Sequence, residues 1–151
     1  MTDIPIPPEK IWSGFLRYLV AAERSPLSAR RWLSRRELTE PAREELFAQA
    51  EAEGYLSPRR YAELYLRRAE EIGSKPFWIL KKMLAQRGVG ANHLAGLAFD
   101  ELVALKNYVK KKYSRKLSRD HHKVILQKLR LKGFSSSLAK KALEELSGER
   151  S

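Results

Sequence analysis

Hydrophobic residues recur along this chain of 151 residues at the three- and four-residue spacing of amphipathic helices. The pattern is clearest over residues 54–88, where it predicts two helices. Each begins at a serine that a proline soon follows, Ser57 and Ser74, and each is followed by a glycine, Gly73 and Gly88. Apolar residues cover so much of the second helix that neighbouring helices must pack around it.

The spacing also assigns faces to these two helices. The first carries a shared face of five residues, and the second carries three residues on one face with three more that widen its apolar surface. For the first helix they are Tyr61, Leu64, Tyr65, Arg68 and Ile72, and for the second they are Phe77, Leu80 and Leu84, widened by Trp78, Ile79 and Met83. The three tryptophans of the chain, Trp12, Trp32 and Trp78, are expected to anchor the core.

Serine, threonine and proline positions divide the rest of the chain in the same way. Ser25 with Pro26, Thr39 and Ser118 are predicted to begin helices, and Gly133 is predicted to end one. With the two helices above, these signals predict nine helices in all. The other seven are expected over residues 8–24, 25–37, 40–53, 91–97, 100–116, 118–133 and 135–148.

Three leucines share a register that indicates an internal repeat. Leu33, Leu84 and Leu129 are separated by 51 and 45 residues, and each is followed five residues later by another apolar residue. Steps of this length hold three helices, and no triplet can bury its apolar faces alone, so the triplets must stack into an elongated, curved array. The predicted repeats are residues 9–56, 57–98 and 99–148, after a lead-in over residues 1–8 that is expected to be disordered.

The composition favours an all-α fold. Val, Ile and Thr together number only 13, which is poor material for a sheet, whereas the abundant Ala, Leu, Arg, Lys and Glu favour helices. The chain has no cysteine, so disulfides and thiolate metal sites are excluded. Residues 1–10 do not resemble a signal peptide, and no apolar run is long enough to span a bilayer. We therefore expect a cytoplasmic protein without a membrane partner.

The net charge of +12 is concentrated in the second half of the chain. Residues 1–75 carry a net charge of +1, with arginine as the main cation, and residues 76–151 carry +11, with lysine as the main cation. Such a field favours a polyanionic partner, of which nucleic acid is the commonest. A basic face that only keeps the protein in solution is the alternative.

Several short motifs keep a characteristic order and spacing. They are Ser-Arg-Arg-Glu-Leu at residues 34–38, Gly-Tyr-Leu at 54–56, Arg-Tyr-Ala at 60–62, Arg-Gly-Val at 87–89 and Lys-Gly-Phe at 132–134, with Arg67, Arg68 and Pro76 between them. Their order resembles that of the RecX family of recombinase regulators, and the resemblance extends over residues 12–147.

The resemblance implies a regulator that is not an enzyme and needs no cofactor. Members of that family bind the filament that RecA forms on single-stranded DNA, lie along its groove, and inhibit recombinase and ATPase activity. For this chain the resemblance implies a RecA-type filament and single-stranded DNA as partners in recombination and DNA repair. A monomer is the expected state. Two alternatives stay open: a sequence-independent nucleic-acid-binding protein without a recombinase partner, and a helical-repeat adaptor that binds only protein.

The triplet Asp120-His121-His122 suggests a phosphoesterase as an alternative function, because one class of phosphoesterases carries an Asp-His-His motif. Such a site needs several carboxylates to hold divalent metal ions, and the chain has only three aspartates. The histidines show no zinc-ligand spacing, and the sequence has no glycine-rich phosphate loop. Neither an enzymatic function nor a metal site is therefore expected.

Basic residues form the candidate contacts to the filament or to nucleic acid. The run over residues 110–116 is the best patch, with Lys106 and Lys110 expected on one exposed helix face, and its alternative is a solubilising surface. Tyr108 and Tyr113 have rings that can stack on bases, but at helical spacing they are expected to belong to the core. The candidate binding residues are Arg60, Arg67, Arg68, Lys81, Lys82, Arg87, Lys106, Lys110, Lys111, Arg115, Lys116, Lys123, Lys128, Arg130 and Lys132.

Overall fold

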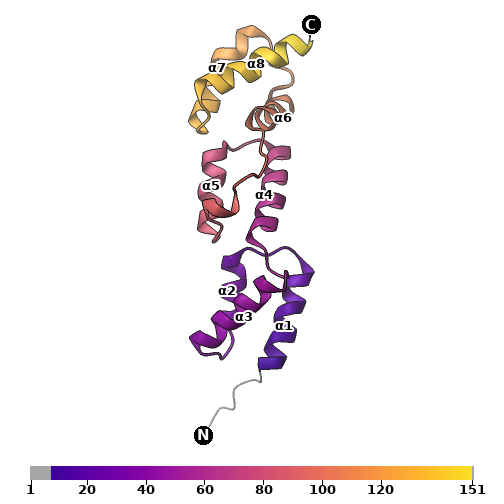
Figure 1. Cartoon of the computed structure of the whole chain (residues 1–151). Coiled ribbons are helices and arrows are strands. Elements are labelled where there is room, and N and C mark those ends of the chain that lie inside the picture. The colour runs from indigo at the N-terminus through magenta and orange to yellow at the C-terminus, as the bar shows by residue number, and fades with distance from the viewer. Residues whose placement is uncertain (1–7, 151) are drawn as a thin grey trace. The chain divides into compact units, whose positions relative to one another are not determined.

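The computed structural model describes residues 8–150, and every regular element within them is helical (Figure 1). The expected all-α class is confirmed. The expected disordered lead-in falls outside the described residues, except that Pro8 begins the first helix. The elements are α1 (Pro8–Ala21), α2 (Pro26–Ser34), α3 (Glu40–Ala52), α4 (Pro58–Ile72), α5 (Phe77–Gln86), the 3₁₀ helix η1 (Ala91–His93), α6 (Glu101–Tyr113), α7 (Arg119–Leu131) and α8 (Ser136–Arg150). None of the helices in this part of the chain is long and apolar enough to cross a lipid bilayer.

Most helices begin where serine or threonine signals predict. The hydroxyls of Thr39 and Ser57 accept hydrogen bonds from the backbone N–H three residues later, at 3.3 and 3.0 Å. Ser118 also directly precedes its helix, α7, as predicted, but its side chain makes no capping hydrogen bond to the helix backbone. Its hydroxyl lies 3.0 Å from Nδ1 of His121 instead, so a nearby side chain has replaced the backbone as its partner.

Several helices differ in extent from the sequence pattern. The helix expected over residues 91–97 is only the single 3₁₀ turn η1, because glycines on both sides interrupt the helical backbone. The α1, α2 and α6 helices each end three residues earlier than expected, and α7 ends two residues earlier, at Ala21, Ser34, Tyr113 and Leu131, respectively. The α8 helix continues through Gly148, which was expected to end it. The described residues therefore hold eight α-helices and one 3₁₀ turn in place of nine α-helices.

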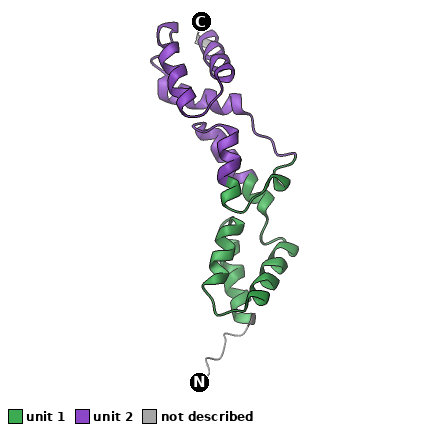
Figure 2. Ribbon diagram, turned by 90° about the vertical axis from the view of Figure 1, so that its left-hand side faces the viewer, with its two compact units in different colours: residues 1–62, 84–95 green, residues 63–83, 96–151 purple. Residues whose placement is uncertain are grey.

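The chain forms two compact units, which divide α4 and α5 between them (Figure 2). Unit 1 comprises residues 1–62 and 84–95, and unit 2 comprises residues 63–83 and 96–151. Each unit is described separately below. The division falls within the predicted second repeat, and the boundaries of the three repeats stay a prediction.

Unit 1 has a core that α1, α2 and α3 build. Phe15 is fully buried there; the ring of Trp32 stacks on it with 5.3 Å between centroids, and Trp12 meets it edge-on at 6.4 Å. The expectation that Trp12 and Trp32 anchor the core is therefore confirmed. The buried members of this core are Ile11, Phe15, Leu19, Ala29, Leu33, Leu46, Phe47, Ala50 and Leu56.

Unit 2 has a second core, which α6, α7 and α8 build. Its residues recur at helical spacing on all three helices, so three amphipathic faces close on one another. The buried members are Leu105, Val109, Tyr113, Leu117, Ile125, Leu129, Phe134, Ala139, Ala142, Leu143 and Leu146.

The face predicted for α4 is wrong by about one position. Ala62 and Leu66 are buried, whereas Ile72 is 59% exposed. Tyr61 is only half-buried, because its hydroxyl accepts a hydrogen bond from Nη1 of Arg87 at 3.0 Å. A tyrosine that must keep a polar partner lies at the edge of a buried stripe rather than in its centre.

One contact recurs between the end of one helix and the start of another. In unit 1 the backbone N–H of Leu27 in α2 donates to the carbonyl oxygen of Arg87, just after α5, at 3.1 Å. In unit 2 the indole Nε1–H of Trp78 in α5 donates to the carbonyl oxygen of Gly133, just after α7, at 2.9 Å. Since α2, α5 and α7 carry the three leucines in register, the two contacts join similar positions of the predicted repeats.

Glycine is required at both of these turns. Gly88 and Gly133 have φ angles of 89° and 102°, which other residues rarely adopt. Each also lies close to the opposing helix, so that a Cβ atom would approach Pro26 or Trp78, respectively, to 2.9 Å. A larger residue would therefore strain the turn and push the two helices apart.

Candidate nucleic-acid and filament interface

The basic run at the end of α6 lies on the surface of unit 2. Lys110 and Lys111 are exposed in the last turn of the helix, and Arg115 and Lys116 are exposed just after it. Cations are favoured at this end of a helix because the exposed carbonyl groups carry partial negative charge. The run is therefore accessible, and its part in binding stays a prediction.

Lys111 also has a partner within the protein. Its Nζ donates a hydrogen bond to the backbone carbonyl oxygen of Glu71 at 3.0 Å, in the last turn of α4. Carbonyl groups in that turn have no partner within their own helix, so the lysine caps α4. Lys111 thus joins α6 to the end of α4 within unit 2.

Lys106 does not lie on the exposed face to which its spacing assigned it. Its side chain is only 19% exposed, and its Nζ lies 4.0 Å from Oε1 of Glu145 on α8. The α8 helix packs along α6, so it covers Lys106 and leaves Lys110, one turn later, exposed. Lys106 is therefore a poor candidate for a phosphate contact.

Three lysines surround a pair of tyrosines of α6. The Nζ atoms of Lys112 and Lys132 lie 5.9 and 5.1 Å from the centroid of the Tyr108 ring. The Nζ atom of Lys128 lies 5.8 Å from the centroid of the Tyr113 ring. Each distance is within the range of cation–π attraction, so the rings hold cations of α6 and of the α7 region around one pair of side chains.

Tyr113 itself belongs to the core, as expected. The residue is 6% exposed, and this burial raises the pKa of its hydroxyl, with a further rise from the neighbouring Tyr108. The hydroxyl therefore stays neutral at physiological pH. A ring that is buried to this extent is unable to stack on a base, and a binding role for the lysines around the pair stays a prediction.

The outer face of α7 combines basic with apolar residues. Lys123, Lys128 and Arg130 are exposed, but so are Val124 and Leu131, the latter by 87%. A shallow depression of about 490 Å³ lies along this face. Sequence reasoning missed the two apolar residues, although their seven-residue separation, away from the buried stripe, is the signal that identifies them.

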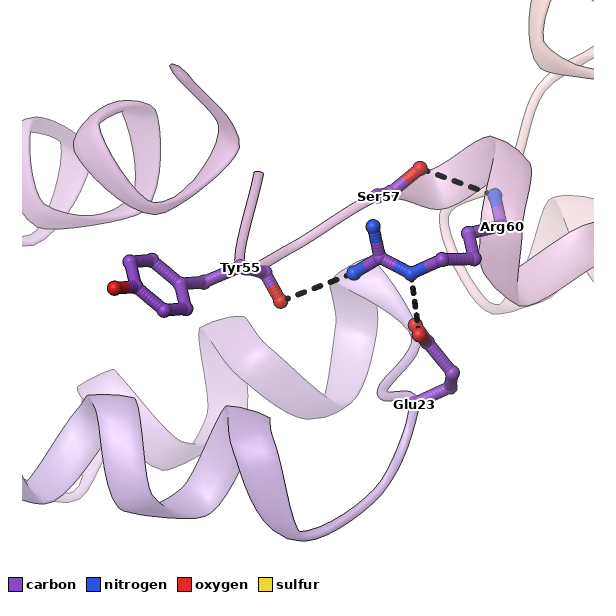
Figure 3. Close-up of polar contacts among 4 residues, drawn as sticks. All are labelled: Glu23, Tyr55, Ser57 and Arg60. Atoms are coloured by element: carbon purple, nitrogen blue, oxygen red, sulfur yellow. Dashed lines mark hydrogen bonds and ion pairs between the residues drawn. The ribbon is translucent and has the colours of Figure 1, made fainter. Parts of the chain in front are cut away.

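Arg60 is bound within unit 1 (Figure 3). Its Nε forms an ion pair with the carboxylate of Glu23, and its Nη2 donates to the carbonyl oxygen of Tyr55 at 3.4 Å. Its backbone N–H donates to the hydroxyl of Ser57 at 3.0 Å. These contacts attach the loop between α1 and α2 to the start of α4. The guanidinium therefore already has a structural role.

The other candidates on α4 and α5, and directly after α5, differ in accessibility. Arg67 and Arg68 are exposed on α4, and Lys81 and Lys82 are exposed on α5. Arg87 is half-buried, because its guanidinium donates to the tyrosine hydroxyl described above. The structure thus leaves four of these five cations open to solvent, and their role in binding stays a prediction.

Trp78 is not the core anchor that its residue type suggested. Its side chain is 54% exposed on α5. The indole N–H already has an acceptor in the carbonyl oxygen of Gly133, so the ring needs no deeper burial to satisfy its polar atom. The sequence signal was its position, since Trp78 lies beside the stripe of Phe77, Leu80 and Leu84 rather than on it.

The Asp-His-His triplet has local partners in unit 2. Nε2 of His122 lies 3.1 Å from the carbonyl oxygen of Leu117 and 3.0 Å from the hydroxyl of Ser147 on α8. His121 bonds to the Ser118 hydroxyl, as described above. Within residues 8–150, no group of three or more His, Asp or Glu side chains is placed to hold a metal ion. The histidines of the triplet therefore help to attach the start of α7 to its surroundings.

Comparison with known proteins identifies the fold. No protein-family model matches this sequence, and no curated protein matches it. A crystal structure of regulatory protein RecX matches with a TM-score of 0.68 and 22% identity, over 91% of this chain and 71% of that one. A crystal structure of RecX from Lactobacillus salivarius matches with a TM-score of 0.69 and 22% identity, over 93% of this chain and 96% of that one. At this identity the likeness is one of fold, and it covers most of the chain.

Proposed function

We propose that this chain is a RecX-like regulatory protein that binds the RecA–single-stranded DNA filament and lowers its recombinase and ATPase activity. The observation that carries the proposal is the fold, which two RecX structures match over 91% and 93% of the chain. The order of short motifs between residues 34 and 134 supports the same assignment. A regulator of this kind acts by binding rather than by catalysis.

The charge distribution supports a filament that contains DNA as the partner. Residues 76–151 carry a net charge of +11, and cations that bind phosphates gain affinity by releasing the counterions of the nucleic acid. Contacts to phosphates need no particular base sequence, which suits a regulator that meets any strand. The exposed cations of the α6 and α7 region are Lys110, Lys111, Lys112, Arg115, Lys116, Arg119, Lys123, Lys128, Arg130 and Lys132.

The ATPase activity of RecA at saturating single-stranded DNA tests the proposal. We expect inhibition at amounts of this protein far too small to coat the DNA, because a filament-directed regulator acts on the assembly. Titration of naked DNA in the same buffer is the control, since it measures the amount that coats the strand. Inhibition that appears only at the coating amount would contradict the proposal.

A sequence-independent nucleic-acid-binding protein is the second candidate. The exposed lysines of α6 and α7 favour it, because they need no recombinase to bind phosphates. Tight binding to naked DNA that RecA neither strengthens nor redirects would select this function over the first. An adaptor that binds only protein is favoured by the exposed Leu131, and it would bind no nucleic acid at physiological salt.

A further inference from the structure

Trp78 is exposed and yet held in a fixed orientation. Its Nε1–H donates to the carbonyl oxygen of Gly133 at 2.9 Å, and its ring packs so closely on that glycine that a Cβ there would lie 2.9 Å from Cζ2. The edge of the indole is therefore fixed against the turn after α7. More than half of the side chain remains in solvent, at 54% exposure. A partner that covers this ring gains the hydrophobic stabilisation that folding leaves unused.

The surroundings of Trp78 are basic. Lys81 and Lys82 follow it at three and four residues, so they lie on the same side of α5, and both are exposed. Between residues 73 and 99 the chain has four cations and no carboxylate. Lys132 directly precedes the glycine whose carbonyl accepts the hydrogen bond, and its Nζ lies 5.1 Å from the centroid of the Tyr108 ring. The exposed ring thus lies on a helix of unit 2 whose exposed charged side chains are positive.

One carboxylate does lie near this part of α5. Oε1 of Glu101 accepts a hydrogen bond from the backbone N–H of Phe77 at 3.0 Å, at the start of the helix. The glutamate is half-buried and is engaged with the helix start, where negative charge is favoured. It therefore serves α5 itself and does not reverse the positive charge around the exposed ring.

We propose that Trp78 is a stacking platform for an unpaired base of single-stranded nucleic acid, and that Lys81 and Lys82 bind the phosphates beside that base. Every base has an aromatic face, so a tryptophan platform binds single strands without reading their sequence. A ring that is already fixed in place loses little conformational freedom when the base arrives. The inference deepens the proposed function, because it names a residue that contacts bases in the filament. It rests on the proposed function for the assumption that the single strand belongs to a RecA filament.

A protein partner is the rival occupant, because tryptophan is also common at the centres of protein interfaces. The charge around Trp78 favours nucleic acid, since two exposed lysines on the same helix face pair with two phosphates more readily than with an apolar protein surface. The experiment below keeps the rival as a separate outcome.

The test compares Trp78→Leu with Trp78→Phe in the full-length protein. Both variants lose the Nε1–H donor and the bond to Gly133, but only phenylalanine keeps an aromatic face. Each is titrated with a fluorescent oligo(dT) and with an abasic oligonucleotide of the same length and charge at the same salt concentration. We expect the leucine variant to bind oligo(dT) about 5- to 150-fold more weakly than the phenylalanine variant, and the two to bind the abasic strand equally.

Two controls accompany these titrations. Val20→Ala removes another exposed apolar side chain, in α1, and is expected to bind both strands as the wild type does. Circular dichroism melting curves show whether the Trp78 variants fold. Tryptophan fluorescence adds an independent readout, because stacking on Trp78 quenches emission in the wild type and this part of the quenching is expected to be absent in Trp78→Phe.

Several results would overturn the inference. Equal oligo(dT) affinities of the leucine and phenylalanine variants would show that the aromatic face is not used, and equal losses on both strands would show that Trp78 only supports the fold or the charge. Normal oligo(dT) binding together with lost ATPase inhibition would assign Trp78 to a protein contact. The titrations contain no recombinase, so they test base stacking even if this protein does not inhibit RecA. Likewise, the ATPase assay tests the proposed function even if Trp78 does not stack on bases.

Discussion

Unit 1 and unit 2 both carry many cations, but the two units use them differently. In unit 1 the arginines hold the fold together. Cζ of Arg36 lies 3.5 Å from the ring centroid of Trp32, and its Nη1 donates to the carbonyl oxygen of the same residue at 3.0 Å. Arg24 makes the same two contacts with Tyr18: its Cζ lies 4.1 Å from the ring centroid, and its Nε donates to the carbonyl oxygen at 3.0 Å.

In unit 2 most of the cations are lysines at the surface. The closest of them to a tyrosine ring is Lys132, whose Nζ lies 5.1 Å from the Tyr108 centroid, and the side chain of Lys116 is exposed. A planar guanidinium can stack and donate in several directions at once, whereas an ammonium is a mobile point charge. Net charge alone therefore does not locate a binding surface. The informative property is which cations already have a partner within their own unit.

The largest expected effect comes from removing the basic run of unit 2. The variant is K110A/K111A/R115A/K116A. If all four residues contact phosphates of single-stranded DNA, the slope of log K against log salt falls in magnitude by about 0.7 for each contact, or about 3 in all. At physiological salt this corresponds to a loss of affinity of about 100-fold. Titrations of naked DNA and of the RecA filament over a range of salt concentrations measure both quantities.

A matched variant of unit 1 provides the control. It is K10A/R17A/R31A/R35A, which removes four exposed cations and is expected to leave the slope unchanged. An equal fall in both variants would break the comparison, because any exposed cation would then contribute. A fall with the filament alone would assign the run of unit 2 to the recombinase protein, and no change in either assay would make it a solvated face.

A smaller effect is expected when a structural arginine of unit 1 is removed. Arg36→Ala loses both the stacking on Trp32 and the hydrogen bond to its carbonyl, so we expect the free energy of unfolding to fall by about 1–2 kcal/mol. Arg36→Lys is expected to recover less than half of the loss, because lysine lacks the planar fork. Urea denaturation followed by circular dichroism measures the change. Lys132→Ala in unit 2 is the control and is expected to stay within about 0.5 kcal/mol of the wild type. Equal losses for Arg36→Ala and Lys132→Ala would remove the contrast between the units.

The smallest effect sharpens the comparison within unit 2. Lys111 is exposed and also caps α4, so Lys111→Met is expected to lower the free energy of unfolding by about 0.3–1 kcal/mol, because methionine keeps an unbranched stem but has no donor. Lys116→Met is the control without such a cap and is expected to cause no measurable change. The same urea denaturation distinguishes them, and identical stabilities would mean that the bond from Lys111 to Glu71 contributes nothing.

The helices could be predicted from the sequence because their signals are local. Thr39 and Ser57 act within three residues of themselves, and the apolar spacing of α3 and α6 is visible over a few turns. The failures occur where a tertiary partner overrides the local signal. Ser118 prefers the ring of His121 to the backbone, and Tyr61 is held at the edge of the core by a guanidinium.

The candidate site was less predictable, because it depends on pairs that are far apart in sequence. The spacing of residues correctly placed the lysines at the end of α6 on the surface. The spacing could not predict that Arg60 pairs with Glu23, 37 residues away, or that Trp78 bonds to Gly133, 55 residues away. These two pairs decide which cation is engaged and which ring is exposed, so they also decide which residues are available to a partner.

The recurring contact between helix ends has a consequence for sequence divergence. Pro26 faces Gly88, and Trp78 faces Gly133, at distances that leave no room for a side chain on either glycine. Each pair is therefore constrained jointly, because a bulkier residue on one side requires a compensating change on the other. We expect such coupled positions to persist longer than overall identity, which is 22% between this chain and either RecX structure. A search pattern built on the spacing of these pairs would detect homologues that whole-chain identity no longer connects.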